Sequence, residues 1–236
     1  MHRGSALSSE PKVADALAEA AVAEIQSGMT VGLGTGRTAS RAVLALAERV
    51  RHENLKIRCV PTSHTTETLA RSQQLELADF AMIEHVDYLF DGADEVDPQM
   101  RMLKGAGGAI VRERMVARAA AKRVYIIDES KLVDRLGQRT TLPIAVLAFG
   151  LASVRARLRD MALHGVVRRT LDGHLFLTDN GSLIIDVTLE DRDVAELACE
   201  INDVAGVIDH GLFLDEADEI LIDTPRGIEK MVRQQT

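Results

Sequence analysis

The feature that most constrains this chain is the alternation, through its first half, of short apolar segments with longer segments of helical spacing. Strands separated by helices of this length connect through right-handed crossovers, which build a mainly parallel sheet. The apolar segments predict strands at 29–33, 56–60, 86–90 and 123–127. The periodic segments predict helices at 12–26, 38–51, 65–72 and 109–121.

The pattern changes at about residue 141. Asp179-Asn180-Gly181 lies between two apolar segments and is typical of a β-hairpin turn. With the helices around it, this hairpin predicts a smaller α+β unit, and residues 211–223 offer two short strands that return to the first sheet. The elements predicted here are strands at 142–148, 175–178 and 183–187 and helices at 151–163 and 191–201.

We therefore predict an α/β fold with a mainly parallel, Rossmann-like sheet that carries helices on both faces, and a smaller α+β domain of ferredoxin-like type. The predicted boundaries assign residues 1–131 plus 208–236 to the first domain and residues 132–207 to the second. In open parallel sheets, ligands bind beyond the carboxyl ends of the strands. The loops that follow the predicted strands are therefore the candidate site.

Charge and composition restrict the partners of the chain. Lys and Arg total 28 against 36 Asp and Glu, a formal net charge of −8, and only 3% of the residues are aromatic. Such a surface repels a nucleic-acid backbone and has few rings for stacking bases, so we expect no nucleic-acid partner. The most apolar stretch, 143–154, is too short to cross a bilayer, and residues 1–10 lack a signal-peptide pattern. We expect a cytoplasmic protein without membrane contact, in which Cys59 and Cys199 are reduced, buried thiols.

The loop at 32–38 is rich in glycine and threonine. Its glycines expose backbone N–H groups, and the helix that follows adds positive potential, so the loop is a candidate for holding an anion. Thr35 and Thr38 add hydroxyl donors, and the alternative is a plain strand-to-helix turn with a capping threonine. A dinucleotide site would need an acid at the end of the second strand, where Thr62 and Ser63 stand instead, so we expect no nicotinamide cofactor.

The third predicted strand leads into the acidic segment Asp91-Gly92-Ala93-Asp94-Glu95. Carboxylates at the end of a buried strand are costly unless they are hydrogen-bonded, paired or functional. The residues alone leave a polar cap, a divalent-metal site and a catalytic role open, although no compensating set of metal ligands is evident. Further on, Lys104 begins a glycine-rich turn, where it could stabilise an oxyanion or be a solvated side chain.

Glu113 is the most informative residue of the helix that follows. A carboxyl group on a packed helix face has its pKa raised by desolvation, which suits a general base, while a salt bridge to Lys104 or an arginine is the alternative. Val111 and Met115 lie opposite Glu113, so we expect the helix to be buried on two sides. Lys131, after the fourth strand, could reach the same cleft or be a surface charge. At about 100° per residue, the side chains within about 60° of Glu113 are those of Ala109, Ile110, Val116, Ala117 and Ala120.

Together, these segments resemble the ribose-5-phosphate isomerase A family in residues, order and spacing over nearly the whole chain. Each segment is a weak signal alone, but their conjunction is specific. The segments that carry the resemblance are Gly-Leu-Gly-Thr-Gly-Arg-Thr-Ala (32–39), Pro-Thr-Ser (61–63), Asp-Gly-Ala-Asp-Glu (91–95), Lys-Gly-Ala-Gly-Gly-Ala (104–109) with Arg112-Glu113, Asp-Glu-Ser-Lys (128–131), Asp-Asn-Gly (179–181) and Gly-Leu-Phe (211–213).

The resemblance implies an enzyme that interconverts ribose 5-phosphate and ribulose 5-phosphate through an enediolate, without a metal or organic cofactor, as a homodimer or homotetramer. It implies that Glu113 is the catalytic base and that Lys104 stabilises the developing oxyanion. It also implies that Asp91 and Asp94 contact sugar hydroxyls and assist ring opening. The substrate-binding residues that it implies are Thr35, Gly36, Arg37, Thr38, Asp91, Gly92, Ala93, Asp94, Lys104, Gly105, Ala106, Gly107 and Lys131.

Two residues depart from the family pattern. Arg37 stands where the family usually has Ser, and it could grip a phosphate in bidentate fashion or fill the space meant for it. Ala106 stands where the family usually has Gly, and its Cβ would narrow the pocket if a glycine-type φ were required there. A related pentose or tetrose phosphate is therefore an alternative substrate.

Two other classes of function share similar folds. A sugar-phosphate-sensing domain of a bacterial regulator would carry a DNA-binding helix-turn-helix, and no basic recognition helix is evident here. An acyl or coenzyme A transferase would also employ a glutamate, but the sequence indicates no coenzyme A pocket. We therefore expect the isomerase rather than either of these.

Overall fold

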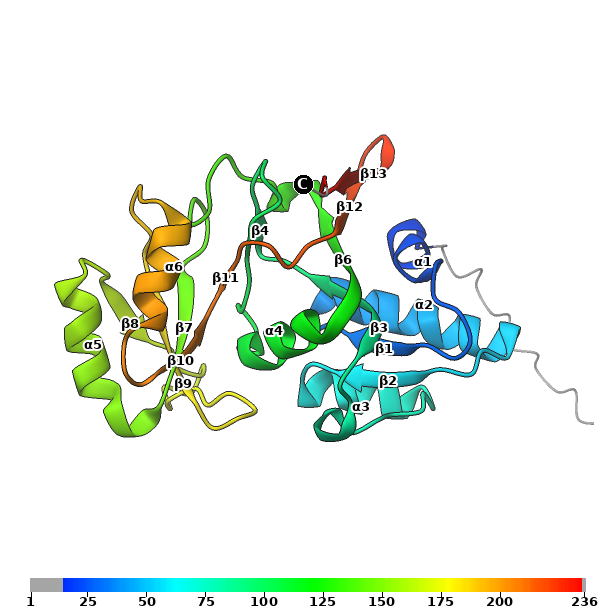
Figure 1. Ribbon diagram of the computed structural model, residues 1–236, viewed down its shortest axis with the longest axis horizontal. Coiled ribbons are helices and arrows are strands. Elements are labelled where there is room, and N and C mark those ends of the chain that lie inside the picture. Colours follow the sequence, from blue (N-terminus) through cyan, green and yellow to red (C-terminus); the bar gives the residue numbers. More distant parts are fainter. Residues whose placement is uncertain (1–14, 235–236) are drawn as a thin grey trace, which may run out of the picture.

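The structure is a computed structural model that describes residues 15–234. Along the longest axis of the molecule, a six-stranded sheet lies at one end and a four-stranded sheet at the other (Figure 1). A three-stranded sheet in the order β11-β5-β4 lies between them. Its strands are β4 (Glu95–Val96), β5 (Met102–Leu103) and β11 (Leu212–Phe213).

The six-stranded sheet has the order β13-β12-β6-β3-β1-β2. Every neighbouring pair in it is parallel except β12 with β13. The carboxyl ends of β1, β3 and β6 therefore lie at one edge, as the predicted crossovers require. The strands are β1 (Thr30–Leu33), β2 (Arg58–Pro61), β3 (Val86–Gly92), β6 (Ala120–Asp128), β12 (Glu219–Thr224) and β13 (Gly227–Val232).

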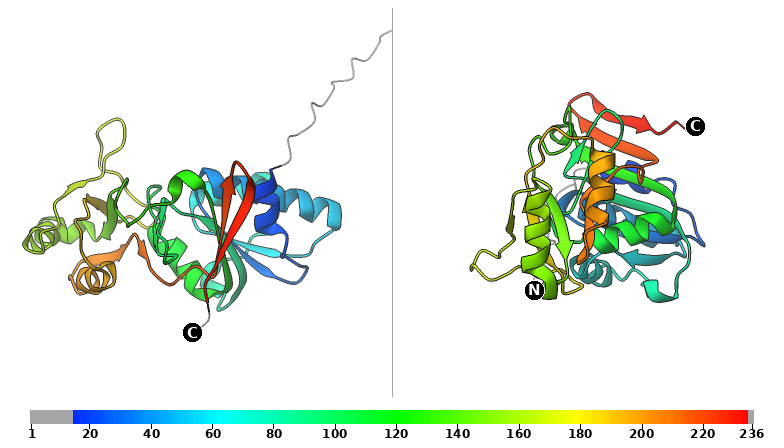
Figure 2. Two further views of the ribbon diagram at one scale, coloured as in Figure 1. Left: turned by 90° about the horizontal axis from the view of Figure 1, so that it is seen from above. Right: turned by 60° about the vertical axis from the view of Figure 1, so that its left-hand side comes forward.

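Helices cover both faces of this sheet, which explains why its strands are apolar on both sides (Figure 2). Tyr88 and Phe90 of β3 face the core that contains α1 and α2, whereas Leu89 between them faces α4. Helix α3 packs beside α2 and β2. The helices are α1 (Ala16–Val22), α2 (Arg37–Glu53), α3 (His64–Ser72) and α4 (Ile110–Ala119), with short 3-10 turns at Phe80–Met82, Glu129–Lys131 and Ala148–Gly150.

The four-stranded sheet is antiparallel, in the order β10-β7-β9-β8. Helices α5 and α6 share one apolar core with its strands. This arrangement is an α+β unit, as predicted. Its elements are β7 (Leu142–Val146), α5 (Leu151–Asp160), β8 (Gly165–Val167), β9 (Leu183–Val187), α6 (Val194–Asn202) and β10 (Val207–His210).

The predicted hairpin of 175–178 with 183–187 is wrong. Strand β9 pairs instead with β7 on one side and, on the other, with β8, a strand that the prediction omitted. Arg168 N continues that pairing by donating to Ile184 O, at 2.8 Å, and Phe176 N then donates to the carbonyl of Arg168 on its other side, at 3.0 Å. The tight turn that Asp179-Asn180-Gly181 predicted does form, because Gly181 N donates to Thr178 O at 2.9 Å.

Other differences are smaller. The helix predicted at 109–121 ends at Ala119, since Ala120 already has the extended dihedral angles of β6. The helix predicted at 12–26 is α1, and residues 12–14 lie outside the described residues. Both cysteines are free, but Cys199 is exposed on α6, so only Cys59 is buried as predicted. Among residues 15–234, no helix is both long and apolar enough to span a membrane.

The mainly parallel sheet with helices on both faces and the smaller α+β unit are confirmed. Of the two C-terminal strands predicted to return to the first sheet, β12 does so, whereas β11 pairs with β5 in the three-stranded sheet. We propose that the two larger sheets correspond to two domains. Because β10 pairs with β7 of the four-stranded sheet, we place the second boundary after His210 rather than before residue 208.

Candidate active site

Asp91, at the end of β3, ties the glycine loop to the sheet. Its Oδ1 accepts hydrogen bonds from Thr35 N at 3.0 Å and from Gly92 N at 2.7 Å. A Cβ at Gly34 would lie 2.2 Å from this oxygen, so the close approach requires glycine there. The carboxyl group of Asp91 is fully buried. The loop and the acidic segment, which the sequence presents separately, are therefore one hydrogen-bonded unit.

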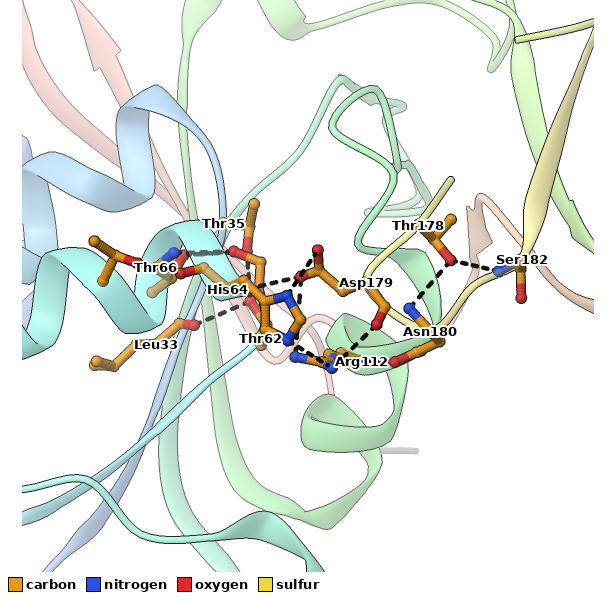
Figure 3. A network of polar contacts seen from close by, with 12 residues as sticks. Leu33, Thr35, Thr62, His64, Thr66, Arg112, Thr178, Asp179, Asn180 and Ser182 are labelled. Carbon is orange, nitrogen blue, oxygen red and sulfur yellow. Dashed lines mark hydrogen bonds and ion pairs between the residues drawn. The ribbon is translucent and has the colours of Figure 1, made fainter. Parts of the chain in front are cut away.

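A cluster of threonine hydroxyls fixes the same loop from the side of β2 and α3 (Figure 3). Thr35 Oγ1 lies 2.8 Å from Thr62 Oγ1 and 3.2 Å from Thr66 Oγ1. Thr62 donates to Leu33 O and Thr66 donates to Gly34 O, at 3.0 and 2.9 Å. Because those two hydrogens are used on carbonyls, the hydroxyl of Thr35 is the donor within the cluster.

The turn of the α+β unit contacts two helices beside the site (Figure 3). Asp179 Oδ2 accepts a hydrogen bond from His64 N, in the first turn of α3, at 2.7 Å. Arg112 of α4 donates through Nε to Asn180 Oδ1 at 2.9 Å, and its NH2 lies 3.2 Å from His64 Nε2. The segment 179–180 therefore joins α3 to α4 across the junction between the two larger sheets.

Lys104 is a buried cation between two carboxylates. Its Nζ lies 3.0 Å from Asp91 Oδ2 and 3.2 Å from Glu113 Oε1, and it donates to Gly92 O. Burial opposes protonation of this amine, but the two carboxylates outweigh burial and hold the pKa of Lys104 above its ordinary value. The amine is thus a fixed positive charge at the centre of the site, not a solvated side chain.

Glu113 lies in the first turn of α4 with its side chain buried. Burial raises the pKa of its carboxyl group to about 8, although Lys104 acts in the opposite direction. Oε1 contacts Lys104, whereas Oε2 is buried and accepts no hydrogen bond from the described residues. The predicted raised pKa and the alternative salt bridge therefore occur together. The expectation that α4 is buried on two sides holds only in part, because Val111 packs half-buried against an apolar core whereas Met115 is exposed.

The two remaining acids of the segment have different partners. Asp94 Oδ2 accepts a hydrogen bond from Ala106 N at 2.9 Å and so holds the glycine-rich turn in place. Glu95 is fully buried, and its oxygens accept from backbone N–H groups within residues 137–140. Glu95 is therefore a structural residue. Within the part of the chain that the structure describes, no group of His, Cys, Asp or Glu side chains is arranged to hold a metal ion.

A cavity of about 390 Å³ opens above these residues. Arg37 and Lys131 lie in its lining, and neither forms an ion pair with another residue of the described range. Asp91 does not reach the lining and supports it from beneath through Lys104. The lining residues are Thr35, Gly36, Arg37, Thr38, Gly92, Ala93, Asp94, Lys104, Gly105, Ala106, Gly107, Glu113, Asp128 and Lys131.

Known proteins share this architecture. A profile described as ribose 5-phosphate isomerase A (phosphoriboisomerase A) matches residues 58–227. The chain belongs to this family. Ribose-5-phosphate isomerase A of Thermomicrobium roseum is 45% identical over 214 residues, which are 90% of each chain. The structure of ribose 5-phosphate isomerase A from Methanocaldococcus jannaschii has a TM-score of 0.88 at 34% identity, with 92% of this chain and 97% of that chain covered. A D-ribose-5-phosphate isomerase in complex with phospho-erythronic acid has a TM-score of 0.87 at 32% identity, with 92% and 96% covered.

Membership of the ribose 5-phosphate isomerase A family confirms the predicted enzyme class, an aldose–ketose isomerase. The structure also shows how the two residues that depart from the family pattern, Ala106 and Arg37, fit into the site. Ala106 is not among the residues with positive φ, which in this turn are Gly105 and Gly108, so alanine fits there without backbone strain. Arg37 is exposed at the first position of α2, where its guanidinium extends the positive rim of the cavity.

Sequence reasoning missed two features of this site. Asp128, at the end of β6, lines the cavity and accepts a hydrogen bond from Ser130 N at 3.1 Å. The position of Asp128 at the carboxyl end of a predicted strand is the signal that identifies it as a candidate for the site. Thr66 gave no such signal, because only the folded chain shows that α3 brings its hydroxyl to Gly34.

Proposed function

We propose that this protein interconverts ribose 5-phosphate and ribulose 5-phosphate through an enediolate, with Glu113 as the general base. One observation carries the proposal. Glu113 has one oxygen held by Lys104 and a second, unpartnered oxygen, in a buried carboxyl group that lines a cavity. A carboxylate in this environment is a stronger base than one in water, because burial disfavours its charge.

The proton transfer follows from this geometry. With the open-chain aldose in the cavity, Glu113 Oε2 removes the hydrogen of C2, and negative charge develops on O1. Lys104 stabilises that charge, since its ammonium is fixed before the reaction begins. Glu113 then returns the proton to C1 while the hydroxyl proton of O2 moves to O1, which leaves the ketose.

Asp94 and Asp91 have different proposed roles. Asp94 lines the cavity and can accept a hydrogen bond from a sugar hydroxyl while its Oδ2 remains on Ala106 N. It is the acid best placed to assist ring opening. Asp91 is fully buried and bonded to the loop and to Lys104, so we propose that it acts mainly by fixing them rather than by contacting the sugar.

The phosphate is proposed to lie at the glycine loop. The first turn of α2 offers backbone N–H groups at this place. Thr38, Arg37 and Lys131 line the same cavity and add a hydroxyl group and two cations. The related isomerase bound to phospho-erythronic acid supports a site for a sugar phosphate in this fold. We further propose a cytoplasmic homodimer or homotetramer, on the resemblance to the family alone.

A substrate panel with EDTA present tests the proposal. We expect ribose 5-phosphate to be converted to ribulose 5-phosphate faster than any other phosphorylated pentose or tetrose, and unphosphorylated ribose to be a poor substrate. The chelator should not lower the rate, since Lys104 stabilises the negative charge that develops on O1. Failure to turn over ribose 5-phosphate, or turnover only after a divalent metal is added, would contradict the proposal.

The pH dependence follows from the raised pKa of Glu113. A base must be ionised, so kcat/KM should rise with pH, and the midpoint should lie well above the ordinary pKa of a glutamate and towards the value of about 8 set mainly by burial. The measurement is the initial rate at low substrate between about pH 5 and pH 9. A rise that is already complete near the ordinary pKa of a carboxyl group would contradict a buried base.

A further inference from the structure

Arg114, the residue after Glu113, is almost fully buried at 8% exposure. Its Nε contacts both carboxylate oxygens of Asp209, at 2.8 and 2.9 Å, and its NH1 donates to Glu216 Oε1. Its guanidinium carbon lies 4.0 Å from the centre of the Phe213 ring. A buried arginine with this many partners is held in one orientation, and it fixes the backbone of α4 at that position.

The backbone that Arg114 contacts is the segment that supports Lys104. Arg114 NH2 donates to the carbonyls of His210 and Leu212, at 2.7 and 2.9 Å. Between these two residues, Gly211 O accepts a hydrogen bond from Lys104 N at 2.9 Å. Strand β11 then pairs with β5, which ends next to Lys104. One guanidinium therefore links the helix that carries Glu113 to the strand that positions its cationic partner.

Phe213 strengthens this link. Its ring lies 4.0 Å from the guanidinium carbon of Arg114 and 5.6 Å from Lys104 Nζ, so it contacts both cations. The first turn of α4, in contrast, has no side-chain hydrogen bond at its N-cap, Ala109. The start of this helix therefore depends on side-chain contacts further along it, of which those of Arg114 are the most numerous polar ones.

We propose that Arg114 is a positioning residue that holds the carboxyl group of Glu113 against Lys104 and out of water. The inference rests on the proposed role of Glu113 as the base. If Arg114 loosens, water reaches Glu113, and the burial that raises the pKa of its carboxyl group weakens. The other groups that face this carboxyl are Lys104, Asp91, Asp94 and Tyr125.

The test replaces Arg114 by lysine, which keeps the charge but cannot form the planar fork. Arg123→Lys is the matched control, because Arg123 contacts both oxygens of Asp218. Arg123 lies towards the start of β6, whereas the cavity is lined by Asp128 at the end of this strand. We expect R114K to lower kcat by about 10- to 100-fold with KM changed by less than about 3-fold. Its rise of kcat/KM with pH should move to lower pH by about half a unit or more. R123K should keep the wild-type kcat and pH profile even where its Tm falls.

Three results decide the inference. A folded R114K protein with the wild-type kcat and pH profile would overturn it. If R114K does not fold, Glu216→Gln weakens the same contact, and an unchanged kcat and pH profile in that variant would overturn the inference equally. Glu113→Gln separates the two levels, because activity retained in E113Q removes the proposed base. An inactive E113Q beside a fully active R114K removes only the positioning role.

Discussion

Replacing Glu113 by glutamine is expected to lower kcat by about 10²- to 10⁴-fold. The amide has nearly the shape of the carboxyl group and can keep a contact with Lys104, but it cannot accept the C2 proton. Since the side chain is buried and one of its oxygens is already bound, the pocket should hardly change. The measurement is kcat and KM for ribose 5-phosphate, beside the dissociation constant of a non-reacting phosphorylated sugar acid.

Two controls make the result of E113Q specific. Ligand affinity and Tm should remain near the wild-type values, because a neutral side chain costs less to bury than a charged one. Arg112→Gln, at the preceding position of α4, removes a contact with Asn180 but not the base, and it should retain far more activity than E113Q. Wild-type kcat in E113Q would refute the assignment of Glu113.

Replacing Lys104 by methionine is the second large effect that we expect. Removal of the cation leaves Asp91 and Glu113 buried without a compensating charge, and breaking a buried pair costs about 3 to 5 kcal/mol of unfolding free energy. The charge that develops on O1 also loses its stabilising partner, which should lower kcat by about 10²-fold or more. Urea unfolding and steady-state kinetics measure the two effects independently.

The control for Lys104→Met is Lys122→Met. Lys122 Nζ lies 2.9 Å from Glu219 Oε2, and the buried carboxyl group of Glu219 has a second cationic partner in Lys230. Because Lys230 still compensates the charge of Glu219, loss of Lys122 should cost about 1 kcal/mol or less and leave kcat unchanged. If K104M and K122M were equally stable and equally active, the buried pair would have no special role.

The pH dependence of the stability of K104M has a definite sign. Lys104 lowers the pKa of Glu113, so its loss raises that pKa further above the value in the unfolded chain. A carboxyl group with a raised pKa in the folded state stabilises the fold below its unfolded pKa and loses that contribution as pH rises through the folded one. Wild-type Glu113 itself has a pKa of about 8, so wild type and K104M lose this contribution in parallel below that pH. The difference in unfolding free energy between them should therefore be constant up to a pH of about 8 and grow above it, where only K104M continues to lose stability. A difference that also stays constant above that pH would contradict the raised pKa of Glu113.

Local patterns predicted most of the large sheet. Apolar strands at the positions of β1, β2, β3 and β6 and periodic helices between them are features of the sequence alone, because a sheet buried on both faces must be apolar on both sides. The same rule brought the ends of β1, β3 and β6 together, and with them Thr35, Asp91 and Lys131. Glu113 could be placed on a buried face because helical geometry fixes its neighbours.

What failed depends on contacts between distant residues. β8 is short and mixed in exposure, so only its pairing with β9 defines it as a strand. The exposed residues Leu175 and Leu177 are apolar without being part of a core, which made 175–178 resemble a strand. Arg114 directly follows Glu113, yet its acidic partners Asp209 and Glu216 lie about a hundred positions further along the chain. No local pattern predicts such contacts.

The most direct measurement is the exchange of hydrogen with solvent during turnover in D₂O, followed by NMR. If one buried carboxylate carries the proton between C2 and C1, wild-type enzyme should introduce deuterium from D₂O into its product, because the acidic hydrogen on Glu113 can equilibrate with solvent between turnovers. E113Q should introduce essentially none on the same time scale while still binding ligand. Deuterium incorporation by E113Q at the wild-type rate would show that another group moves the proton, and the account of the site would be wrong.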